Sequence, residues 1–131
     1  MIVLDTHAWL WLALEPKRLS RAATQAIRRA TRGDGIAIAS ISLLEAAWLF
    51  ANGRVRSSST VGQALAELVD ATSVQTLDVT PEIAVTAVQL PESVPPDPAD
   101  RLIVSTALVH GLSLVTRDAR IQDARACSVV W

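Results

Sequence analysis

Residues 97–118 read DPADRLIVSTALVHGLSLVTRD, and this stretch decides the fold. Asp97 is a typical helix N-cap, Pro98 suits the first position of a helix, and Gly111 suits the position just past a helix end. We therefore expect a helix from Pro98 to about residue 110. The apolar, β-type residues 112–116 should then form a short strand.

Carboxylates lie at both ends of this helix–strand unit. Asp100 precedes Ile103 and Val104 by three and four residues, which places all three on one apolar helical face that should pack toward a sheet. A carboxylate directed toward a sheet needs a partner. Asp118 follows directly where the strand should end.

Short apolar runs alternate with helical patterns along the rest of the chain. Further strands are expected at residues 2–4, 36–39, 74–79 and 126–130, and further helices at 6–14, 20–31, 42–52, 61–71 and 81–90. This alternation predicts an α/β fold, a three-layer α/β/α sandwich with a central parallel sheet of about five strands. A chain of 131 residues without repeats should form one domain over residues 1–131.

Composition narrows the class of protein. The chain is 50% hydrophobic with a mean hydropathy of +0.33, so we expect a partner or a second copy to cover part of its apolar surface. A net charge of −1 excludes a global basic field. A single cysteine, Cys127, indicates a reducing compartment such as the cytoplasm, and no apolar run reaches the length of a membrane span.

Basic residues are concentrated early in the chain, on or beside one predicted helix. This cluster is either a solvated helical face or a surface for RNA or an acidic partner, and the sequence leaves both open. Its members are Lys17, Arg18, Arg21, Arg28, Arg29 and Arg32.

Four acids lie where parallel α/β sheets usually place their sites, beyond the carboxyl ends of the strands. Asp5 and Asp118 follow strands, whereas Glu45 and Asp100 lie in the first turns of helices. Carboxylates that converge at one edge of a sheet repel one another unless a cation compensates them. Ligands that are all oxygen favour Mg²⁺ or Mn²⁺, which can polarise a phosphate and promote its hydrolysis.

Each of these acids also has an ordinary structural interpretation. Ser42 and Glu45 fit a capping box, Asp100 could offset a helix dipole, and Asp118 could be a turn residue. Asp5 is the hardest to explain in this way, because an acid that closes a buried strand has little structural use. The four together are harder to attribute to chance than any one alone.

Four motifs resemble those of one known family. Residues 5–11 (DTHAWLW) resemble the opening of PIN-domain ribonucleases, and residues 42–46 (SLLEA) resemble their second acidic motif. Residues 97–103 (DPADRLI) and 114–118 (LVTRD) resemble the third and fourth motifs. The order, the spacing and the chain length are similar to those of the VapC toxins of bacterial toxin–antitoxin pairs, over essentially the whole chain.

The resemblance implies a PIN-like fold and a toxic Mg²⁺-dependent endoribonuclease, with Mn²⁺ as a substitute ion. Such an enzyme would hydrolyse RNA phosphodiester bonds, in transfer or ribosomal RNA, and leave a 5′-phosphate and a 3′-hydroxyl. It would form a homodimer, and a VapB-type antitoxin would silence it. The implied catalytic residues are Asp5, Glu45, Asp100 and Asp118, with Asp5 and Asp100 as the chief metal ligands.

Five residues beside these acids are implied as auxiliary. The hydroxyls of Thr6, Ser42 and Thr116 could bind water or phosphate, and Arg117 could contact phosphate. Asp97 could also be argued to bind the metal. Asp100 is preferred because it aligns with the acid of the family motif and faces the predicted sheet.

The aromatic and histidine residues receive structural interpretations by default. His7 and His110 have no serine or cysteine nucleophile motif beside them. Trp9, Trp11 and Trp48 should pack in the core, although one or more of them could line a groove for the antitoxin or stack on RNA bases.

Three other functions stay open. A phosphoacceptor receiver domain has a similar size, but it needs an acid pair after the first strand and a late lysine, and the sole lysine here is Lys17. A non-catalytic binding module on the PIN scaffold is the second alternative. A PIN nuclease of RNA maturation without an antitoxin is the third, and a short reading frame immediately upstream would favour the toxin over it.

Overall fold

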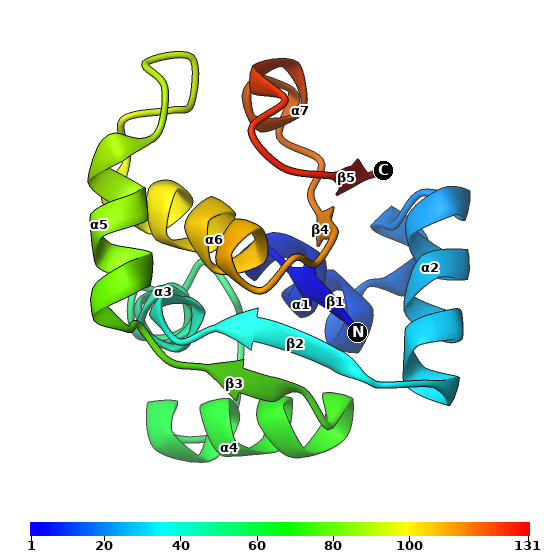
Figure 1. Cartoon of the computed structure of the whole chain (residues 1–131). Helices are drawn as coiled ribbons and strands as arrows, with labels where there is room; N and C mark the ends of the chain where they lie inside the picture. Colours follow the sequence, from blue (N-terminus) through cyan, green and yellow to red (C-terminus); the bar gives the residue numbers. More distant parts are fainter.

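The computed structural model describes all residues, 1–131, and its centre is a five-stranded sheet in the order β3-β2-β1-β4-β5 (Figure 1). Every neighbouring pair of strands is parallel, and helices cover both faces of the sheet. The expected α/β/α sandwich with about five parallel strands is therefore confirmed. The strands are β1 (Ile2–Leu4), β2 (Ile36–Ala39), β3 (Gln75–Leu77), β4 (Leu114–Val115) and β5 (Val129–Val130).

Seven α-helices and one 3₁₀-helix connect these strands. They are α1 (Thr6–Leu14), η1 (Pro16–Arg18), α2 (Arg21–Arg32), α3 (Ile41–Ala51), α4 (Val61–Thr72), α5 (Pro81–Gln89), α6 (Pro98–Val109) and α7 (Ala119–Ala124). The sequence did not predict η1 or α7. None of the helices combines the length and the apolar character needed to span a bilayer.

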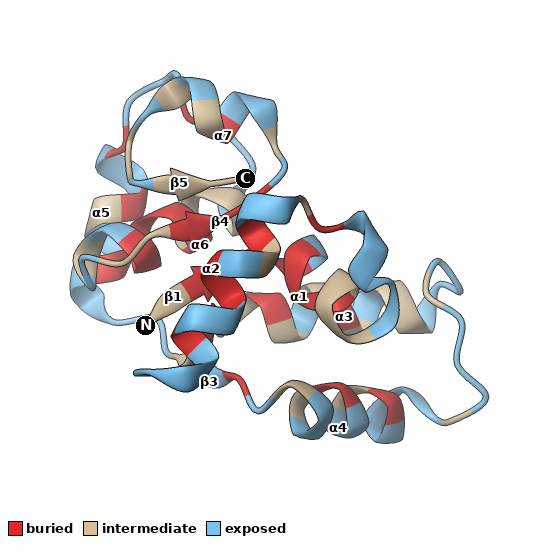
Figure 2. Cartoon of the chain, turned by 90° about the vertical axis from the view of Figure 1, so that its right-hand side faces the viewer, coloured by how far each residue is buried: buried red, intermediate tan, exposed pale blue.

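Successive strand residues point to opposite faces of the sheet, and each face has its own core. Leu4, Ile38 and Val115 pack in one cluster with residues of α1 and α2. Val3 and Leu114 pack in a second cluster with residues of α6 and α7. Figure 2 shows this burial on the central strands and on the inner sides of the helices. The fully apolar strands predicted a sheet covered on both faces, and the two clusters confirm it.

Helix α6 has the bounds that its sequence predicts. The side chain of Asp97 accepts hydrogen bonds from the amides of Ala99 (2.7 Å) and Asp100 (3.2 Å), and Pro98 occupies the first turn. Gly111, at φ 65°, takes the left-handed conformation just past the helix end. Residue 112 does not extend the next strand as expected, because its amide donates to the carbonyl of Ala107 and closes the turn.

Arg101 joins α6 to the end of α5. Its guanidinium donates to the carbonyls of Ala87 (2.8 Å), Leu90 (2.7 Å) and Val94 (3.3 Å). The last carbonyls of a helix have no partners within the helix, so Arg101 supplies hydrogen-bond donors to oxygens that would otherwise have none from the protein. The contact fixes the start of α6, which carries Asp97 and Asp100.

The two central strands bring their carboxyl ends together. β1 runs into Asp5 and β4 runs into Thr116–Asp118, and the amide of Asp5 donates to the carbonyl of Val115 (3.0 Å). Between β1 and β4 the strand order reverses, since β2 and β3 lie on one side of β1 and β4 on the other. Such a switch point is where open α/β sheets form their sites.

Candidate acidic active site

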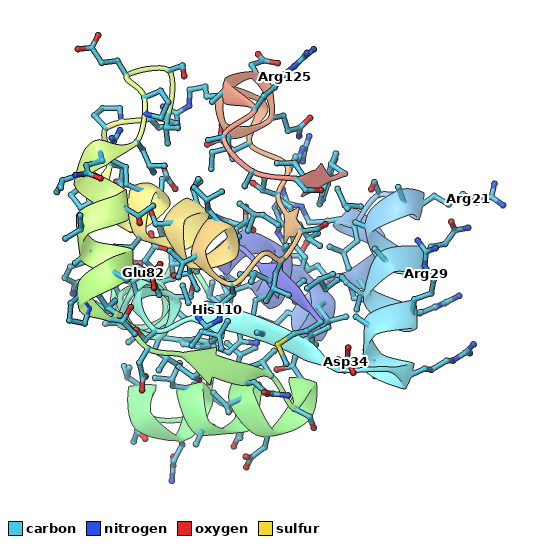
Figure 3. All side chains as sticks on the ribbon, in the orientation of Figure 1. Arg21, Arg29, Asp34, Glu82, His110 and Arg125 are labelled. Carbon is cyan, nitrogen blue, oxygen red and sulfur yellow. The ribbon has the colours of Figure 1, made fainter.

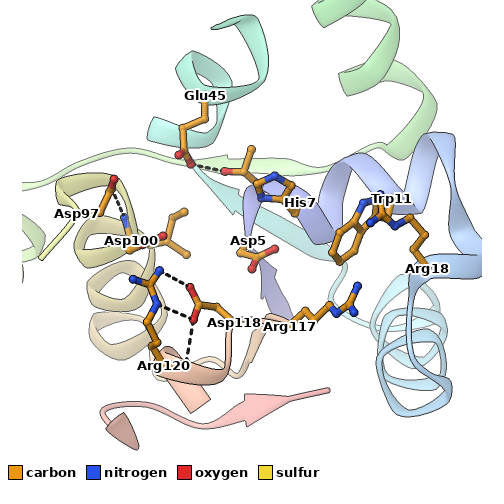
Figure 4. A pocket seen from close by; sticks show the side chains of 12 residues that line it. Asp5, His7, Trp11, Arg18, Glu45, Asp97, Asp100, Arg117, Asp118 and Arg120 are labelled. Carbon is orange, nitrogen blue, oxygen red and sulfur yellow. Dashed lines mark hydrogen bonds and ion pairs between the residues drawn. The ribbon is translucent and has the colours of Figure 1, made fainter. Parts of the chain in front are cut away.

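Asp5, Glu45, Asp100 and Asp118 all line one cleft of about 670 Å³ at this switch point (Figure 4). Asp5 and Asp118 come from the ends of β1 and β4, and Asp100 comes from the first turn of α6. Glu45 was expected in a first turn as well, but it is the fifth residue of α3 and lies past the first turn, because the helix begins at Ile41. The auxiliary candidates Asp97, Thr6 and Arg117 also line the cleft, whereas Ser42 and Thr116 are buried. The remaining lining residues are His7, Trp11, Arg18, Ile103 and Arg120.

Asp5 has a structural role that the sequence interpretation denied it. It is the N-cap of α1, and its Oδ1 accepts a hydrogen bond from the amide of Ala8 (2.7 Å). Burial raises the pKa of Asp5 above its usual value, although the Thr116 hydroxyl and the Ala8 amide oppose the shift. The expectation that an acid at this strand end lacks structural use was wrong, because a helix begins at the next residue.

Asp100 lies close enough to several other carboxylates for their negative charges to raise its pKa. Partial burial, together with the negative charges of Asp97, Asp118 and Glu45, raises the pKa of Asp100 to about 6. Arg120 opposes this shift weakly. The site is therefore a concentration of negative charge that a cation would relieve.

Glu45 is held by a buried hydroxyl pair. The Thr6 hydroxyl is hydrogen-bonded to Oε1 of Glu45 and to Oγ of Ser42 (2.9 Å). The capping-box interpretation of Ser42 and Glu45 is wrong, because α3 begins at Ile41 and Ser42 already lies within it. Buried Ser42 and Thr6 instead fix the direction of the Glu45 carboxylate into the cleft.

Asp118 is engaged by a cation from its own helix. The guanidinium of Arg120 contacts Oδ1 (3.3 Å) and Oδ2 (3.1 Å), and the Arg120 amide donates to Oδ1 (2.9 Å). The side-chain hydrogen bond from Arg120 lowers the pKa of Asp118. Sequence reasoning missed Arg120, although Asp118 is a good N-cap residue and could have indicated that a helix such as α7 begins after it.

The other wall of the cleft is cationic and aromatic. The guanidinium carbons of Arg18 and Arg117 lie 4.8 Å and 6.0 Å from the centre of a Trp11 ring, and the His7 ring lies 5.8 Å away. His7 is exposed. Of the early basic cluster only Arg18 lines this cleft, while Arg21 and Arg29 extend outward from α2 (Figure 3).

The other tryptophans differ from Trp11 in their surroundings. Trp9 is fully buried and donates from Nε1 to the hydroxyl of Thr72 (2.9 Å), so its expected core role is confirmed. Trp48 is 62% exposed on α3, so the expectation of core packing was wrong for this residue. Trp48 is not among the residues that line the acidic cleft.

The donor set fits a hard divalent cation in its chemistry, because the acids that line the cleft offer only oxygen and raise one another's pKa. The carboxylates are not yet gathered into a coordination shell, since no three Asp, Glu, His or Cys side chains form a ready metal site. Asp118 is paired with Arg120, and Glu45 with Thr6. The sequence predicted that the acids would meet at one edge of the sheet. They do line one cleft there, although no three of them are close enough to form a metal site.

Comparison with known proteins places this geometry in a family. The family model described as PIN domain matches residues 2–126. The chain belongs to the PIN domain family. It is 47% identical over 124 residues to "Ribonuclease VapC22" of Mycobacterium tuberculosis, covering 95% of this chain and 92% of that protein. VapC-type PIN ribonucleases generally depend on a divalent metal ion.

Solved structures support the PIN fold. The structure of VapBC2 from Rickettsia felis bound to a promoter DNA fragment has a TM-score of 0.72 at 16% identity, covering 98% of this chain and 97% of that one. The DNA-bound VapBC of Salmonella typhimurium has a TM-score of 0.70 at 18% identity, with coverage of 98% and 97%. At such low identity these likenesses concern the fold alone.

Proposed function

We propose that this PIN domain, residues 1–131, is a toxic endoribonuclease that hydrolyses RNA phosphodiester bonds with Mg²⁺ as its cofactor. The observation that carries the proposal is the convergence of four acids from four separate motifs in one cleft, in a chain 47% identical to a protein named as a ribonuclease. Mn²⁺ substitutes for Mg²⁺, and the substrate is a transfer or ribosomal RNA. The protein acts in the cytoplasm as a homodimer, and a VapB-type antitoxin silences it.

Asp5 and Asp100 are the residues that would hold the cation. Asp5 is fixed by its cap contact to Ala8, and the negative charge of Asp100 is disfavoured by burial and by the neighbouring acids, which a cation would relieve. A divalent ion in this position supplies polarisation of the scissile phosphate and a higher acidity of water. Glu45 and Asp118 would offer further oxygen donors to the cation, and Asp97 would add negative charge to the cleft.

The remaining residues position these acids and the substrate. Thr6 and Ser42 orient Glu45 through hydroxyl hydrogen bonds, and the Thr116 hydroxyl interacts with Asp5. Arg117 is exposed on the cationic wall, where it can neutralise a phosphate that approaches the acids. The chain thus surrounds the scissile bond with an acidic side for the cation and a basic side for the RNA.

The test is cleavage of purified cellular RNA by Asp5→Asn and Asp100→Asn proteins in the presence of Mg²⁺. Each variant should lose activity by at least about 100-fold, because each removes a carboxylate that would hold the cation at the reacting phosphate. Asp70→Asn, on the exposed side of α4, is the matched control and should cleave like the wild type. Full cleavage by Asp5→Asn, with an unchanged circular dichroism spectrum, would refute the site assignment.

The toxin role has a separate test in cells. Induction of the wild type should arrest growth, and co-expression of the product of a short reading frame immediately upstream should restore it. A protein that cleaves RNA in vitro but leaves growth unaffected would instead be a nuclease of RNA maturation. Sequencing of the 5′ ends of cellular RNA after brief induction identifies the substrate in either case.

A further inference from the structure

A second cleft, of about 560 Å³, lies beside the acidic one and shares a wall with it. His7, Trp11 and Arg18 line both clefts. The second cleft continues along the C-terminal half of α1 to the loop after α3, where Arg54 and Arg56 line its far side. A polymer that enters the acidic cleft therefore meets a continuous surface beyond Trp11.

The charge changes sign along this surface. Five carboxylates and three guanidinium groups line the acidic cleft, whereas one acid, Glu15, and three arginines line the second cleft. These arginines are Arg18, Arg54 and Arg56. Glu15 is already paired with Arg18, at 3.8 Å. Arg54 and Arg56 are exposed and belong to no ion pair of the protein, so their positive charges are available to a ligand.

Trp11 organises the junction of the two clefts. Its indole holds Arg18 and Arg117 in cation–π contact, at 4.8 Å and 6.0 Å, and it packs against the Trp131 ring at 5.9 Å. Such contacts restrain long side chains that would otherwise move freely in solvent. The guanidinium groups of Arg18 and Arg117 are therefore held beside the acids, at the point where an extended polymer would pass from one cleft to the other.

We propose that the second cleft binds the RNA backbone next to the scissile bond, with Trp11 as the platform that holds Arg18 and Arg117, and with Arg54 and Arg56 as further phosphate contacts. The inference rests on the proposed ribonuclease function. Only the scissile phosphate of an RNA strand has to enter the acidic cleft. The neighbouring phosphates of the strand are bound best by cationic side chains. The apolar floor and the exposed His7 ring suit unstacked bases of a single strand.

The test compares two pairs of substitutions that remove the same charge. Arg54→Gln/Arg56→Gln removes the proposed contacts, whereas Arg28→Gln/Arg29→Gln removes two exposed arginines of α2 that line neither cleft. Binding of a fluorescein-labelled 12-nucleotide polyuridine RNA is measured by anisotropy over a range of salt concentrations. EDTA and an Asp5→Asn background prevent cleavage, so the result does not depend on catalysis.

We expect the Arg54/Arg56 pair to lower the affinity roughly tenfold or more at 0.1 M salt. The slope of log K against log salt should fall by about 1.4, which corresponds to two lost contacts with a single strand. The Arg28/Arg29 pair should leave the slope unchanged. Equal losses in both pairs would reduce the effect to overall charge and overturn the proposal. A lost affinity for a 12-residue polyglutamate peptide with unchanged RNA binding would assign the cleft to an acidic protein segment instead.

The platform role of Trp11 has its own variants. Trp11→Leu should weaken RNA binding about as much as Arg18→Gln/Arg117→Gln, whereas Trp11→Phe keeps an aromatic face and should retain most of the affinity. Thermal unfolding establishes that each variant is folded under the assay conditions. If Trp11→Leu binds like the wild type, or if the Arg18/Arg117 pair has no effect on the slope, Trp11 organises no phosphate site.

Discussion

Three aspartates of the acidic cleft also cap helices. Asp5 caps α1, Asp97 caps α6 and Asp118 caps α7, each with a side-chain oxygen that accepts from backbone amides. The sequence interpretation treated capping and chemistry as alternatives, but the same carboxylates can do both. Each cap hydrogen bond uses Oδ1, and all three side chains also line the cleft. Asparagine is also a good N-cap, so Asp→Asn removes the charge and spares the helix.

The raised pKa of Asp100 predicts how stability depends on pH. A carboxyl whose pKa rises from 3.8 to about 6 on folding binds its proton more tightly in the folded state. Stability without metal should therefore fall as the pH rises from about 4 to 6, and the loss persists above pH 6. Asp100→Asn removes this penalty and should raise the free energy of unfolding at pH 7 by about 1–2 kcal/mol, allowing for solvent screening.

Urea unfolding in EDTA at several pH values measures this difference. The gain of Asp100→Asn over the wild type should be present at pH 7 and should disappear near pH 3, below the unfolded-state pKa of 3.8, where the wild-type carboxyl is mostly protonated in both states. The control is Asp70→Asn on α4, which should follow the wild type throughout. A gain of Asp100→Asn that is equally large at pH 3 would show that charge is not its cause.

Arg120 should compete with a cation for Asp118. Its guanidinium contacts both carboxylate oxygens and holds the pKa of Asp118 low, so a metal that uses Asp118 must displace it. Arg120→Gln should therefore tighten Mn²⁺ binding several-fold in a calorimetric titration, and Arg125→Gln on the far end of α7 should not. Unchanged or weaker binding by Arg120→Gln would mean that Asp118 is not a ligand or that Arg120 does not block it.

At the scale of elements, the sequence predicted the bounds of the long helices better than the ends of the strands, and it did not predict the short final helix. Asp97, Pro98 and Gly111 are local signals, and α6 has the bounds they indicate. The strands at 74–79 and 126–130 were predicted too long, because an edge strand with a single neighbour keeps only the residues that this neighbour pairs. α7 was missed because six residues are too few for a clear hydrophobic period.

Arg101 should be the side chain on which the junction of α5 and α6 depends most. It satisfies three carbonyls at the end of α5 and in the turn that follows. Arg101→Gln leaves most of them without a donor and should lower the free energy of unfolding by about 2–4 kcal/mol, measured by urea denaturation. Arg125→Gln is again the control, and a loss below about 1 kcal/mol would mean that water replaces the guanidinium.

At the scale of the molecule, the place of the site followed from topology. Parallel strands with alternating helices bring Asp5 and Asp118 to one sheet edge, and the N-terminal halves of α3 and α6 bring Glu45 and Asp100 there too. The cationic wall could not be predicted in this way. Arg18 follows α1 and Arg117 follows β4, and only the packing of both around Trp11 places them together.

The whole fold should respond to a divalent cation, because the folded chain concentrates carboxylates that are far apart in the unfolded one. No three of them form a ready metal site, so binding must draw them together against the contacts of Asp118 with Arg120 and of Glu45 with Thr6. An ion that binds only the folded state stabilises it by about 2.7 kcal/mol at 100 times its dissociation constant. Mg²⁺ or Mn²⁺ should therefore raise the melting temperature of the wild type by several degrees over EDTA.

This stabilisation should vanish where the charge is removed. Asp5→Asn/Asp100→Asn should melt higher than the wild type in EDTA, because the repulsion is relieved, and should gain almost nothing from the ion. Asp70→Asn should show the wild-type gain, since it lies on α4 outside the cleft. Differential scanning calorimetry with and without 5 mM Mn²⁺ measures all three proteins. An equal gain in the double variant would place the cation elsewhere on the molecule and separate the acidic cleft from metal-dependent hydrolysis.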